Sequence, residues 1–224
     1  MRSYQLQLTL LSDATFGRGD GVAGLVDVEV QHDAVGLPYL GGRALKGLLG
    51  AECADLLFAL EKIAPAPEQK ERWQKAALRL FGRSGSHLDG SAILRVGPAR
   101  LPEDLRAALK RDVEQNVLTR ADMLDLFTTL RRQTALDESG APRKETLRTL
   151  RVILSEAVFT APLTFAEEPT ADDLALLAAT VKALRRVGTG RNRGRGRVCA
   201  ELLDAAGNAI TAVHFAAFRQ GVQA

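Results

Sequence analysis

Apolar and polar residues alternate in two stretches near the start of the chain, with the two-residue period of a strand covered on one side. In residues 4–11, leucines alternate with glutamine and threonine. In residues 26–31, the valines predict a buried face, and Asp27 and Glu29 lie on the opposite, exposed face. Both stretches are therefore predicted to be strands, and the glycine-rich residues 16–24 between them to be irregular.

Leucines and alanines spaced three or four residues apart predict helices further along the chain. The predicted helices cover residues 43–60, 69–80, 105–110, 121–132 and 171–185. Further strands are predicted over residues 91–96, 155–165 and 198–203, the last forming a C-terminal hairpin with 210–215. Because these elements mix without strict β-α-β alternation and without a repeat of solenoid length, the predicted fold class is α+β.

A turn rich in Asp, Ser, Gly and Pro, residues 137–142, separates two basic segments, residues 131–136 and 145–151. Turn residues placed between two such segments favour a β-hairpin. The sequence therefore predicts a long basic hairpin that projects from the domain. A run of charge is equally typical of an ordinary solvated face.

Composition narrows the class of protein. Of 224 residues, 46% are hydrophobic and 25% are charged, as in globular proteins. Cys53 and Cys199 have no CxxC or zinc spacing, so we expect buried or semi-buried thiols in a reducing compartment. The N-terminal residues lack the apolar run of a signal peptide, and no stretch approaches the roughly 18–20 apolar residues of a membrane span. We therefore expect a cytoplasmic protein without a membrane partner.

The strongest local signal is residues 185–197 (RRVGTGRNRGRGR), here called the glycine–arginine loop. It contains six arginines, four glycines and no acidic residue, although the formal net charge of the whole chain is only +3. Glycines permit positive φ and close approach of a ligand, and successive N–H groups can form an anion-binding concavity. Arginine adds bidentate contacts to phosphate. The loop is therefore predicted to bind phosphate or the RNA backbone.

Two familiar phosphate motifs are excluded for this loop. A dinucleotide fingerprint follows a strand and opens a helix, whereas this loop follows a predicted helix and precedes a strand. A P-loop requires Gly-Lys followed by Ser or Thr, and the chain has no such tripeptide. A solvated basic loop or a flexible linker remains the alternative interpretation.

Four segments in order along the chain resemble those of the RAMP (repeat-associated mysterious protein) superfamily. The segment 36–47 (GLPYLGGRALKG) resembles that superfamily's "LPyIPGSSLKG" segment, and the glycine–arginine loop resembles its signature loop. Residues 80–82 (LFG) and 136–148 (LDESGAPRKETLR) also match in place and character. The resemblance covers nearly the whole chain and is closest to the repeated backbone subunit of type III CRISPR effector complexes.

This resemblance implies a ferredoxin-like, RNA-recognition-type core with inserted helical and hairpin elements. It implies one RAMP-type RNA-binding domain over residues 1–224, with a thumb-like insertion at about 115–152. The implied partners are CRISPR guide RNA, complementary target RNA, further copies of the chain or related RAMP subunits, and other subunits of a type III complex.

The resemblance also implies a catalytic aspartate shortly before the segment 36–47, and this position falls on Asp27. The implied activity is cleavage of target RNA at regular intervals by a metal-dependent endoribonuclease. Asp27 would share Mg²⁺ or another divalent metal with RNA phosphate and water. The sequence departs from the family pattern where Val28 and Glu29 replace a small residue and proline, and where Arg43 replaces serine.

The RNA-binding residues are predicted at three places. At the start of the helix after Gly42, free N–H groups and added cations favour phosphate. The hairpin and the glycine–arginine loop supply the others. The predicted set is Arg43, Lys46, Arg143, Lys144, Gly188, Gly190, Arg191, Arg193, Gly194, Arg195 and Gly196.

Three alternatives stay open at the level of sequence. The chain can be a structural RNA-binding subunit of the same kind of complex without catalysis, or a general RNA-binding module that works alone. A RAMP protein that processes guide RNA would use a histidine base, for which His32 is the candidate, but a lone histidine in a turn is more often polar surface.

Overall fold

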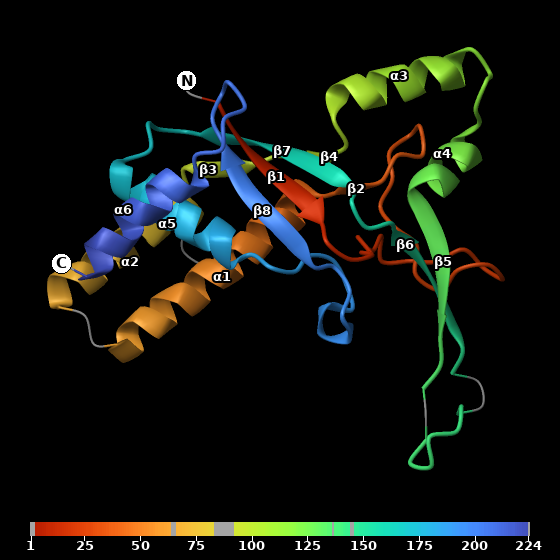
Figure 1. Ribbon diagram of the computed structural model, residues 1–224, viewed down its shortest axis with the longest axis horizontal. Helices are drawn as coiled ribbons and strands as arrows, with labels where there is room; N and C mark the ends of the chain where they lie inside the picture. The colour runs from red at the N-terminus through yellow and green to blue at the C-terminus, as the bar shows by residue number, and fades with distance from the viewer. Residues whose placement is uncertain (1–2, 64–65, 83–91, 136, 144–145, 224) are drawn as a thin grey trace.

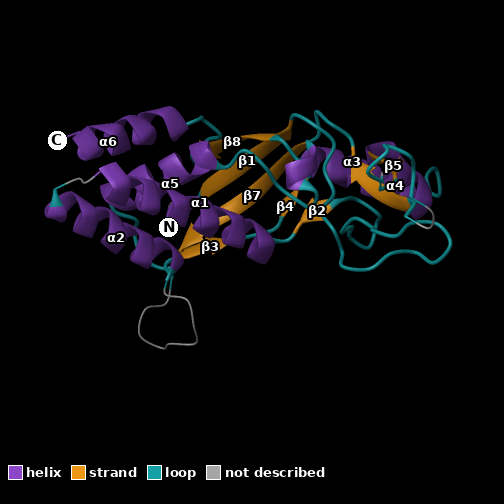
Figure 2. Ribbon diagram, turned by 90° about the horizontal axis from the view of Figure 1, so that it is seen from below, coloured by secondary structure: helices purple, strands orange, loops and turns teal. Residues whose placement is uncertain are grey.

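The computed structural model of the chain has an antiparallel sheet with helices packed on one of its faces (Figure 1, Figure 2). It describes residues 3–63, 66–82, 92–135, 137–143 and 146–223. The strand order is β2-β4-β7-β1-β8, and β3 pairs with a second stretch of β7. The strands are β1 (Tyr4–Leu10), β2 (Tyr39–Leu40), β3 (Leu94–Val96), β4 (Ala99–Arg100), β7 (Val158–Phe165) and β8 (Val198–Leu203).

The helices of the core lie together at one end of the molecule (Figure 2). They are α1 (Gly42–Ile63), α2 (Pro67–Phe81), α5 (Ala171–Ala183) and α6 (Thr211–Gln223). Helix α5 packs against α1, α2 and α6, and every residue from Asp173 to Val181 is buried. Its capping box, Thr170 with Asp173, begins the helix. Leu6 and Leu8 of β1 lie in the same core, which confirms the alternation predicted for this strand.

The core elements follow one another in the order β1, α1, β3 with β4, β7, α5 and β8, and β3 and β4 both pair with β7. This is the β-α-β-β-α-β order of the ferredoxin-like fold, in which the first and third strands are central in the sheet. The predicted α+β class with a ferredoxin-like core is therefore confirmed.

The face of the sheet opposite the helices carries mostly uncharged polar side chains. Gln5, Gln7 and Thr9 of β1 are partly exposed there, between residues of β7 and β8 that alternate in the same way. Of the described strand residues on this face, Tyr39 alone is aromatic; it lies in β2, with the guanidinium of Arg100 5.9 Å from its ring centroid. RNA-recognition domains that stack bases on this face use aromatic residues of the central strands. The described central strands of this sheet present none there.

A helical and hairpin insertion lies at the other end of the molecule (Figure 1). It consists of α3 (Glu103–Glu114), α4 (Arg120–Phe127) and the hairpin of β5 (Thr128–Gln133) with β6 (Arg148–Ile153), which extends away from the main sheet. The predicted hairpin is confirmed. The predicted helix over 121–132 is wrong in its second half, because residues from Thr128 pair with β6 and so become strand.

The predicted C-terminal hairpin is also wrong in its second half. After β8 the chain turns at Asp204, whose carboxylate accepts the N–H of Asn208 (2.9 Å), and residues 211–223 then form α6. Buried or half-buried residues recur at helical spacing in this segment, with Phe218 against Trp73 of α2 (ring centroids 4.8 Å apart). Burial against α2 and α5 therefore outweighs the short alternation over 210–215.

The predicted strand over 26–31 is wrong. This segment makes only isolated bridges, among them Gly17 with Val30 and Val28 with Leu150. Glu29, predicted to be exposed, is buried because its carboxylate pairs with the buried guanidinium of Arg151 (3.0 Å). Inward-facing charge of this kind breaks the alternation of a half-covered strand.

The two cysteines differ in exposure. Cys53 is buried, and burial raises the pKa of its thiol to about 11. Cys199 is exposed, which corrects the predicted buried or semi-buried thiol, because it belongs to the alternating residues of β8 on the open face. Within the described part of the chain, no helix has both the length and the apolar character needed to cross a membrane.

Candidate nucleic-acid interface

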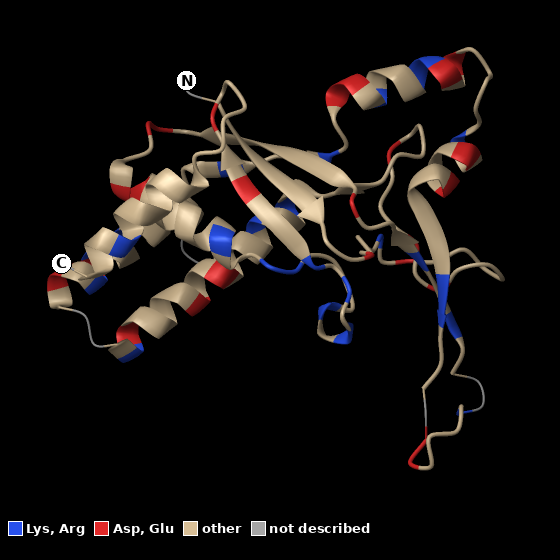
Figure 3. Ribbon diagram, in the orientation of Figure 1, with Lys and Arg blue, Asp and Glu red and all other residues tan. Residues whose placement is uncertain are grey.

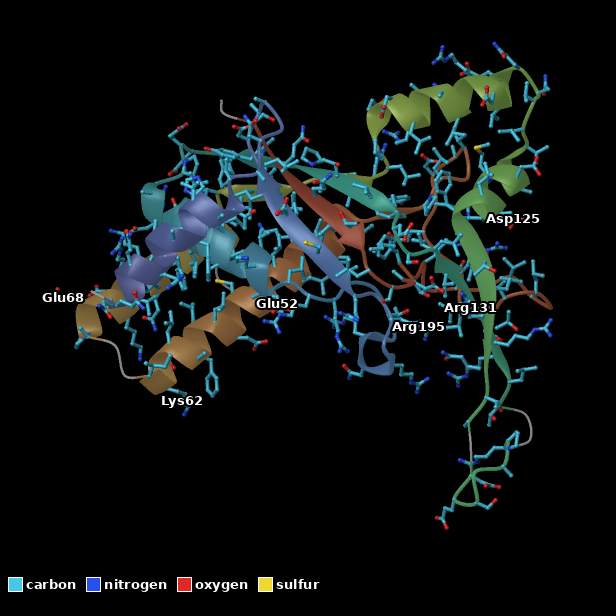
Figure 4. The ribbon with its side chains drawn as sticks, in the orientation of Figure 1. Glu52, Lys62, Glu68, Asp125, Arg131 and Arg195 are labelled. Carbon is cyan, nitrogen blue, oxygen red and sulfur yellow. The ribbon has the colours of Figure 1, made fainter. Side chains whose placement is uncertain are left out.

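A groove of about 1040 Å³ lies between α1, the glycine–arginine loop and the β5–β6 hairpin. The loop side includes Arg185, Arg191, Arg193 and Arg195, and hairpin residues such as Arg148 line the other side. In Figure 4, Arg195 lies between Glu52 of α1 and Arg131 of the hairpin. Figure 3 shows that Lys and Arg gather on the loop after α5 and along the hairpin. The groove therefore has a concentrated positive charge along much of its wall.

The glycines of the loop are required by its backbone. Gly188, Gly190, Gly194 and Gly196 all have positive φ, between 69° and 80°. A Cβ at Gly196 would lie 1.9 Å from the carbonyl oxygen of Val187. Positive φ and this close approach both exclude larger residues, so the sequence pattern encodes a fixed shape rather than a flexible linker.

Backbone hydrogen bonds tie the loop to the segment after β1. The N–H of Thr189 donates to the carbonyl of Thr15 (2.9 Å), and the N–H of Gly196 donates to the carbonyl of Asp13 (2.8 Å). The N–H of Val187 donates to the carbonyl of Gly196 (2.8 Å). Since these N–H groups are used inside the protein, they interrupt the continuous concavity of free donors that the sequence predicted. The arginine side chains therefore carry most of the capacity to bind an anion.

Arg195 has the most distinctive surroundings of these arginines. Its guanidinium packs against Gly190, where a Cβ would lie 2.6 Å from Nη2. Its Nε and Nη1 are buried and have no hydrogen-bond acceptor among the described residues, although the side chain lines the groove. Buried donors without acceptors are costly, by about 1–3 kcal/mol each. Because both nitrogens are shielded from solvent, a phosphate in the groove would pair with them only if the side chain turned outward.

The wall formed by α1 is acidic, which the sequence did not reveal. Glu52 and Asp55 line the groove opposite the loop. Burial and the charge of Asp55 raise the pKa of Glu52, and Arg191 and Arg185 oppose that shift. Spacing of three residues places both acids on one side of a helix, but no local pattern indicates that this side lies opposite the arginines.

The residues predicted at the start of α1 lie outside the groove. Arg43 is exposed in the first turn, and it is absent from the groove wall. The ammonium of Lys46 donates to the carbonyl of Leu94 (2.8 Å), and burial lowers its pKa. Lys46 instead lines a separate hollow between α1 and α2. The structure therefore does not bring these two cations together with the loop.

Of the two predicted hairpin cations, Arg143 is exposed beyond the paired part of the hairpin and Lys144 lies outside the described residues. The hairpin reaches the groove through Gln133, Arg148 and Leu150, toward the end of the β5–β6 ladder that is farther from α4. The imidazole Nδ1 of His32, the candidate base for guide processing, lies 3.2 Å from Nη2 of Arg120 and outside the groove wall.

Asp27 lies in a second, smaller hollow of about 420 Å³, lined by residues 21–27 and Thr149. Its carboxylate is exposed, as predicted, and Oδ2 accepts the N–H of Thr149 (2.7 Å). Oδ1 has no partner among the described residues. A group of three or more His, Cys, Asp or Glu side chains that could hold a metal is absent from the described chain. Asp27 can therefore ligate a divalent ion only together with water and RNA phosphate.

A family model for the RAMP superfamily matches residues 7–199. The chain belongs to the RAMP superfamily. A comparison with curated protein sequences gives no match. The match includes the glycine–arginine loop, Asp27, the insertion and all strands of the ferredoxin-like core except the first residues of β1 and the last of β8.

Solved structures show the same fold. The RAMP chain is similar to a subunit in the Type III-B Cmr-beta complex bound to cognate target RNA (11% identity, covering 89% of this chain and 96% of that one, TM-score 0.60). The apo state gives 12% identity, the same coverage of 89% and 96%, and a TM-score of 0.59. Oligomeric Cmr4 from Pyrococcus furiosus gives 14% identity, 92% and 99% coverage, and a TM-score of 0.50.

Within this RAMP chain, the predicted site residues fall into three places. Gly188, Gly190, Arg191, Arg193 and Arg195 line the groove, and Asp27 occupies the second hollow. Arg43, Lys46 and Arg143 lie elsewhere, and Gly194 and Gly196 belong to the loop without lining the groove. Strand β6 connects the first two places, because Thr149 lines the hollow and its neighbours Arg148 and Leu150 line the groove.

Proposed function

We propose that this protein is an RNA-binding backbone subunit of a type III CRISPR effector complex, with guide RNA bound along the groove. The observation that carries the proposal is the arginine wall of that groove, formed by Arg185, Arg191, Arg193 and Arg195. Support comes from membership of the RAMP superfamily and from a fold similar to a Cmr-beta subunit whose complex holds target RNA. Further copies of the chain, related RAMP subunits and other complex subunits are the proposed protein partners.

We further propose that Asp27 makes the subunit a metal-dependent endoribonuclease acting on guide-bound target RNA. The carboxylate is exposed, has one oxygen without a hydrogen-bond partner among the described residues, and lies beside Thr149 of strand β6. A bound divalent ion would stabilise negative charge on the phosphoryl oxygens of the cut site. The residues of the chain itself hold the carboxylate in place and bind the RNA strand in the adjoining groove.

Purification from the native host followed by sequencing of bound RNA tests the RNA-binding proposal. Guide sequences that flank CRISPR repeats are the expected result. A protein that remains a monomer and never co-purifies with RNA contradicts it. RNA of unrelated sequence bound to a monomer indicates instead a general RNA-binding module that works alone.

Cleavage of a matched target by the purified complex tests the catalytic proposal. Asp27→Ala is expected to abolish cutting, while complex assembly and RNA binding persist. Asp27→Asn keeps the acceptor for Thr149 and removes the charge, so it separates chemistry from local structure. Loss of cutting in chelator, restored by added Mg²⁺, is the expected metal dependence. Full cutting by Asp27→Ala contradicts the role of Asp27.

A structural subunit without catalysis is the second candidate. It is favoured by the engagement of one oxygen of Asp27 by Thr149, and by the absence of a second acidic or histidine residue among the described residues that line the hollow. Complex that binds matched target RNA but leaves it intact, in Mg²⁺ or Mn²⁺, supports this function.

A further inference from the structure

Asp27 and Thr149 are joined by a reciprocal pair of hydrogen bonds. The N–H of Asp27 donates to the carbonyl of Thr149 (2.8 Å), and the N–H of Thr149 donates to Oδ2 of Asp27 (2.7 Å). The two residues are 122 positions apart in the chain. A strand of the hairpin therefore holds both the backbone and the side chain of the proposed catalytic residue.

Strand β6 has two hydrogen-bonding edges, and each has its own partner. One edge pairs with β5 along the hairpin. The other faces the N-terminal segment, where the N–H of Arg151 donates to Val28 (3.0 Å) and the N–H of Ile153 donates to Ala14 (2.7 Å). The N–H of Thr149 belongs to this second edge, two residues before Arg151. Removing this donor therefore leaves the β5–β6 ladder intact.

The neighbouring contacts make this attachment firm. The guanidinium of Arg151 is buried and reaches Glu29 (3.0 Å) and Asp125 (2.9 Å). Gly21 packs on the backbone of the Asp27 segment, since a Cβ there would lie 2.2 Å from the carbonyl of Val26. The hollow around Asp27 is thus built from a short tight loop and one hairpin strand, and the main sheet contributes no residue to it.

We infer that the backbone N–H of Thr149 positions the Asp27 carboxylate for cleavage. The position that the hairpin takes on bound RNA would then determine the orientation of this carboxylate. This inference rests on the proposed function. It assigns Thr149 a positioning role, because its backbone acts through Asp27. Oδ1 is left open toward the hollow while Oδ2 is held, which fixes the direction in which the free oxygen points.

Thr149→Pro tests the inference with a single change, because proline lacks the N–H and suits a strand position whose N–H is outside the ladder. Thr149→Ala is the matched control, since it keeps the N–H and removes the side chain. Each variant is assembled into the complete complex with guide RNA. Single-turnover cutting at saturating target is measured beside target affinity, and cut positions are mapped to the nucleotide.

Thr149→Pro is expected to slow cutting by roughly 100-fold, the effect of a misplacement near 1 Å, with target affinity unchanged. Thr149→Ala keeps the donor, so it should cut at the wild-type positions and at least tenfold faster than Thr149→Pro. If Thr149→Pro fails to fold, an ester in place of the 148–149 amide removes the same donor, and it should show the same loss. Wild-type cutting by the proline or the ester variant overturns the inference.

Hydrogen exchange of the protein alone gives a second measurement that does not depend on activity. In Asp27→Ala, the amide of Thr149 should exchange at least tenfold faster, whereas the amide of Arg151 keeps its protection. Equal protection of Thr149 in both proteins overturns the inference. If instead Asp27→Ala cuts as the wild type does, the proposed catalytic function fails, whatever the exchange shows.

Discussion

The guanidinium of Arg131 in the hairpin donates two hydrogen bonds to Oδ2 of Asp13, from Nε at 3.1 Å and from Nη2 at 2.9 Å. Oδ1 of the same carboxylate accepts the N–H of Ser155 (3.2 Å), and the carbonyl of Asp13 accepts the N–H of Gly196 (2.8 Å). One residue thus contacts the hairpin, the turn between β6 and β7, and the glycine–arginine loop. Asp13 therefore links the two elements whose arginines line the groove.

Asp13→Ala is therefore expected to weaken RNA binding, although it removes a negative charge beside the groove. Charge alone would predict tighter binding. An exposed ion pair contributes about 0–1 kcal/mol, so the variant should fold normally. Fluorescence anisotropy with a labelled RNA at fixed salt measures the change. Asp20→Ala, which removes an exposed acid paired with Arg18, is the control; equal or tighter binding by Asp13→Ala contradicts the coupling.

Neutralising Arg191, Arg193 and Arg195 to glutamine should lower RNA affinity and flatten its dependence on salt. Each lost phosphate contact reduces the slope of log affinity against log salt by about 0.7 for a single strand. A titration between low and physiological salt gives the slope. Arg219→Gln, an exposed change on α6 far from the groove wall, should leave it unaltered. An unchanged slope in the triple variant refutes contact between loop and phosphate.

Glu52→Gln is expected to tighten RNA binding and to remove part of its pH dependence. Burial and Asp55 raise the pKa of Glu52, so its carboxylate takes up a proton at higher pH than an ordinary glutamate does. Because the charged form repels phosphate, wild-type affinity should increase as the pH falls through that raised pKa. Binding curves at several pH values test this, with Glu71→Gln on α2 as the control. A wild-type affinity independent of pH in the acidic range counts against it.

Gly196→Ala should disturb the loop more than Gly194→Ala. Both positions have positive φ, which costs alanine about 1–2 kcal/mol. At Gly194 a Cβ meets nothing within 4 Å, whereas at Gly196 it would lie 1.9 Å from the carbonyl of Val187. Denaturant unfolding and RNA affinity should both separate the two variants. Equal stability would mean that the loop backbone can shift freely.

Arg151→Met should destabilise the protein by about 3–5 kcal/mol, because it leaves the buried carboxylate of Glu29 without a counter-charge. Adding Glu29→Gln should restore much of that loss. Asp125 is exposed, so Asp125→Asn is expected to change stability by about 0–1 kcal/mol. Urea unfolding of the four proteins measures these differences. A mild effect of Arg151→Met would show that water reaches Glu29.

Much of the fold follows from local patterns. The alternation of β1, the capped helix α5 and the turn of the hairpin are each set by neighbouring residues. The wrong predictions arise where contacts with residues far away in the sequence determine the local structure or the burial of a side chain. Glu29 is buried because of Arg151, 122 positions away, and residues 211–223 become a helix because α2 and α5 cover them.

The site divides in the same way. The loop is predictable because its glycines and arginines are consecutive, and its φ angles follow from the glycines. The acidic wall formed by Glu52 and Asp55 faces the arginines only because the fold brings distant segments together. The same holds for the hydrogen bond from Thr149 to Asp27. A helix surface with two acids looks like many solvated helices until the opposite wall is known.

Among the residues that the structure describes, neither the groove wall nor the central strands of the open sheet face offer an aromatic ring to a nucleobase. Contacts between guanidinium groups and phosphates engage what every nucleotide shares, and such contacts carry no information about base identity. A subunit that binds RNA in this way does not distinguish one base sequence from another. Under the proposed function, the same protein binds guide RNAs of any sequence, and base pairing alone distinguishes one target from another.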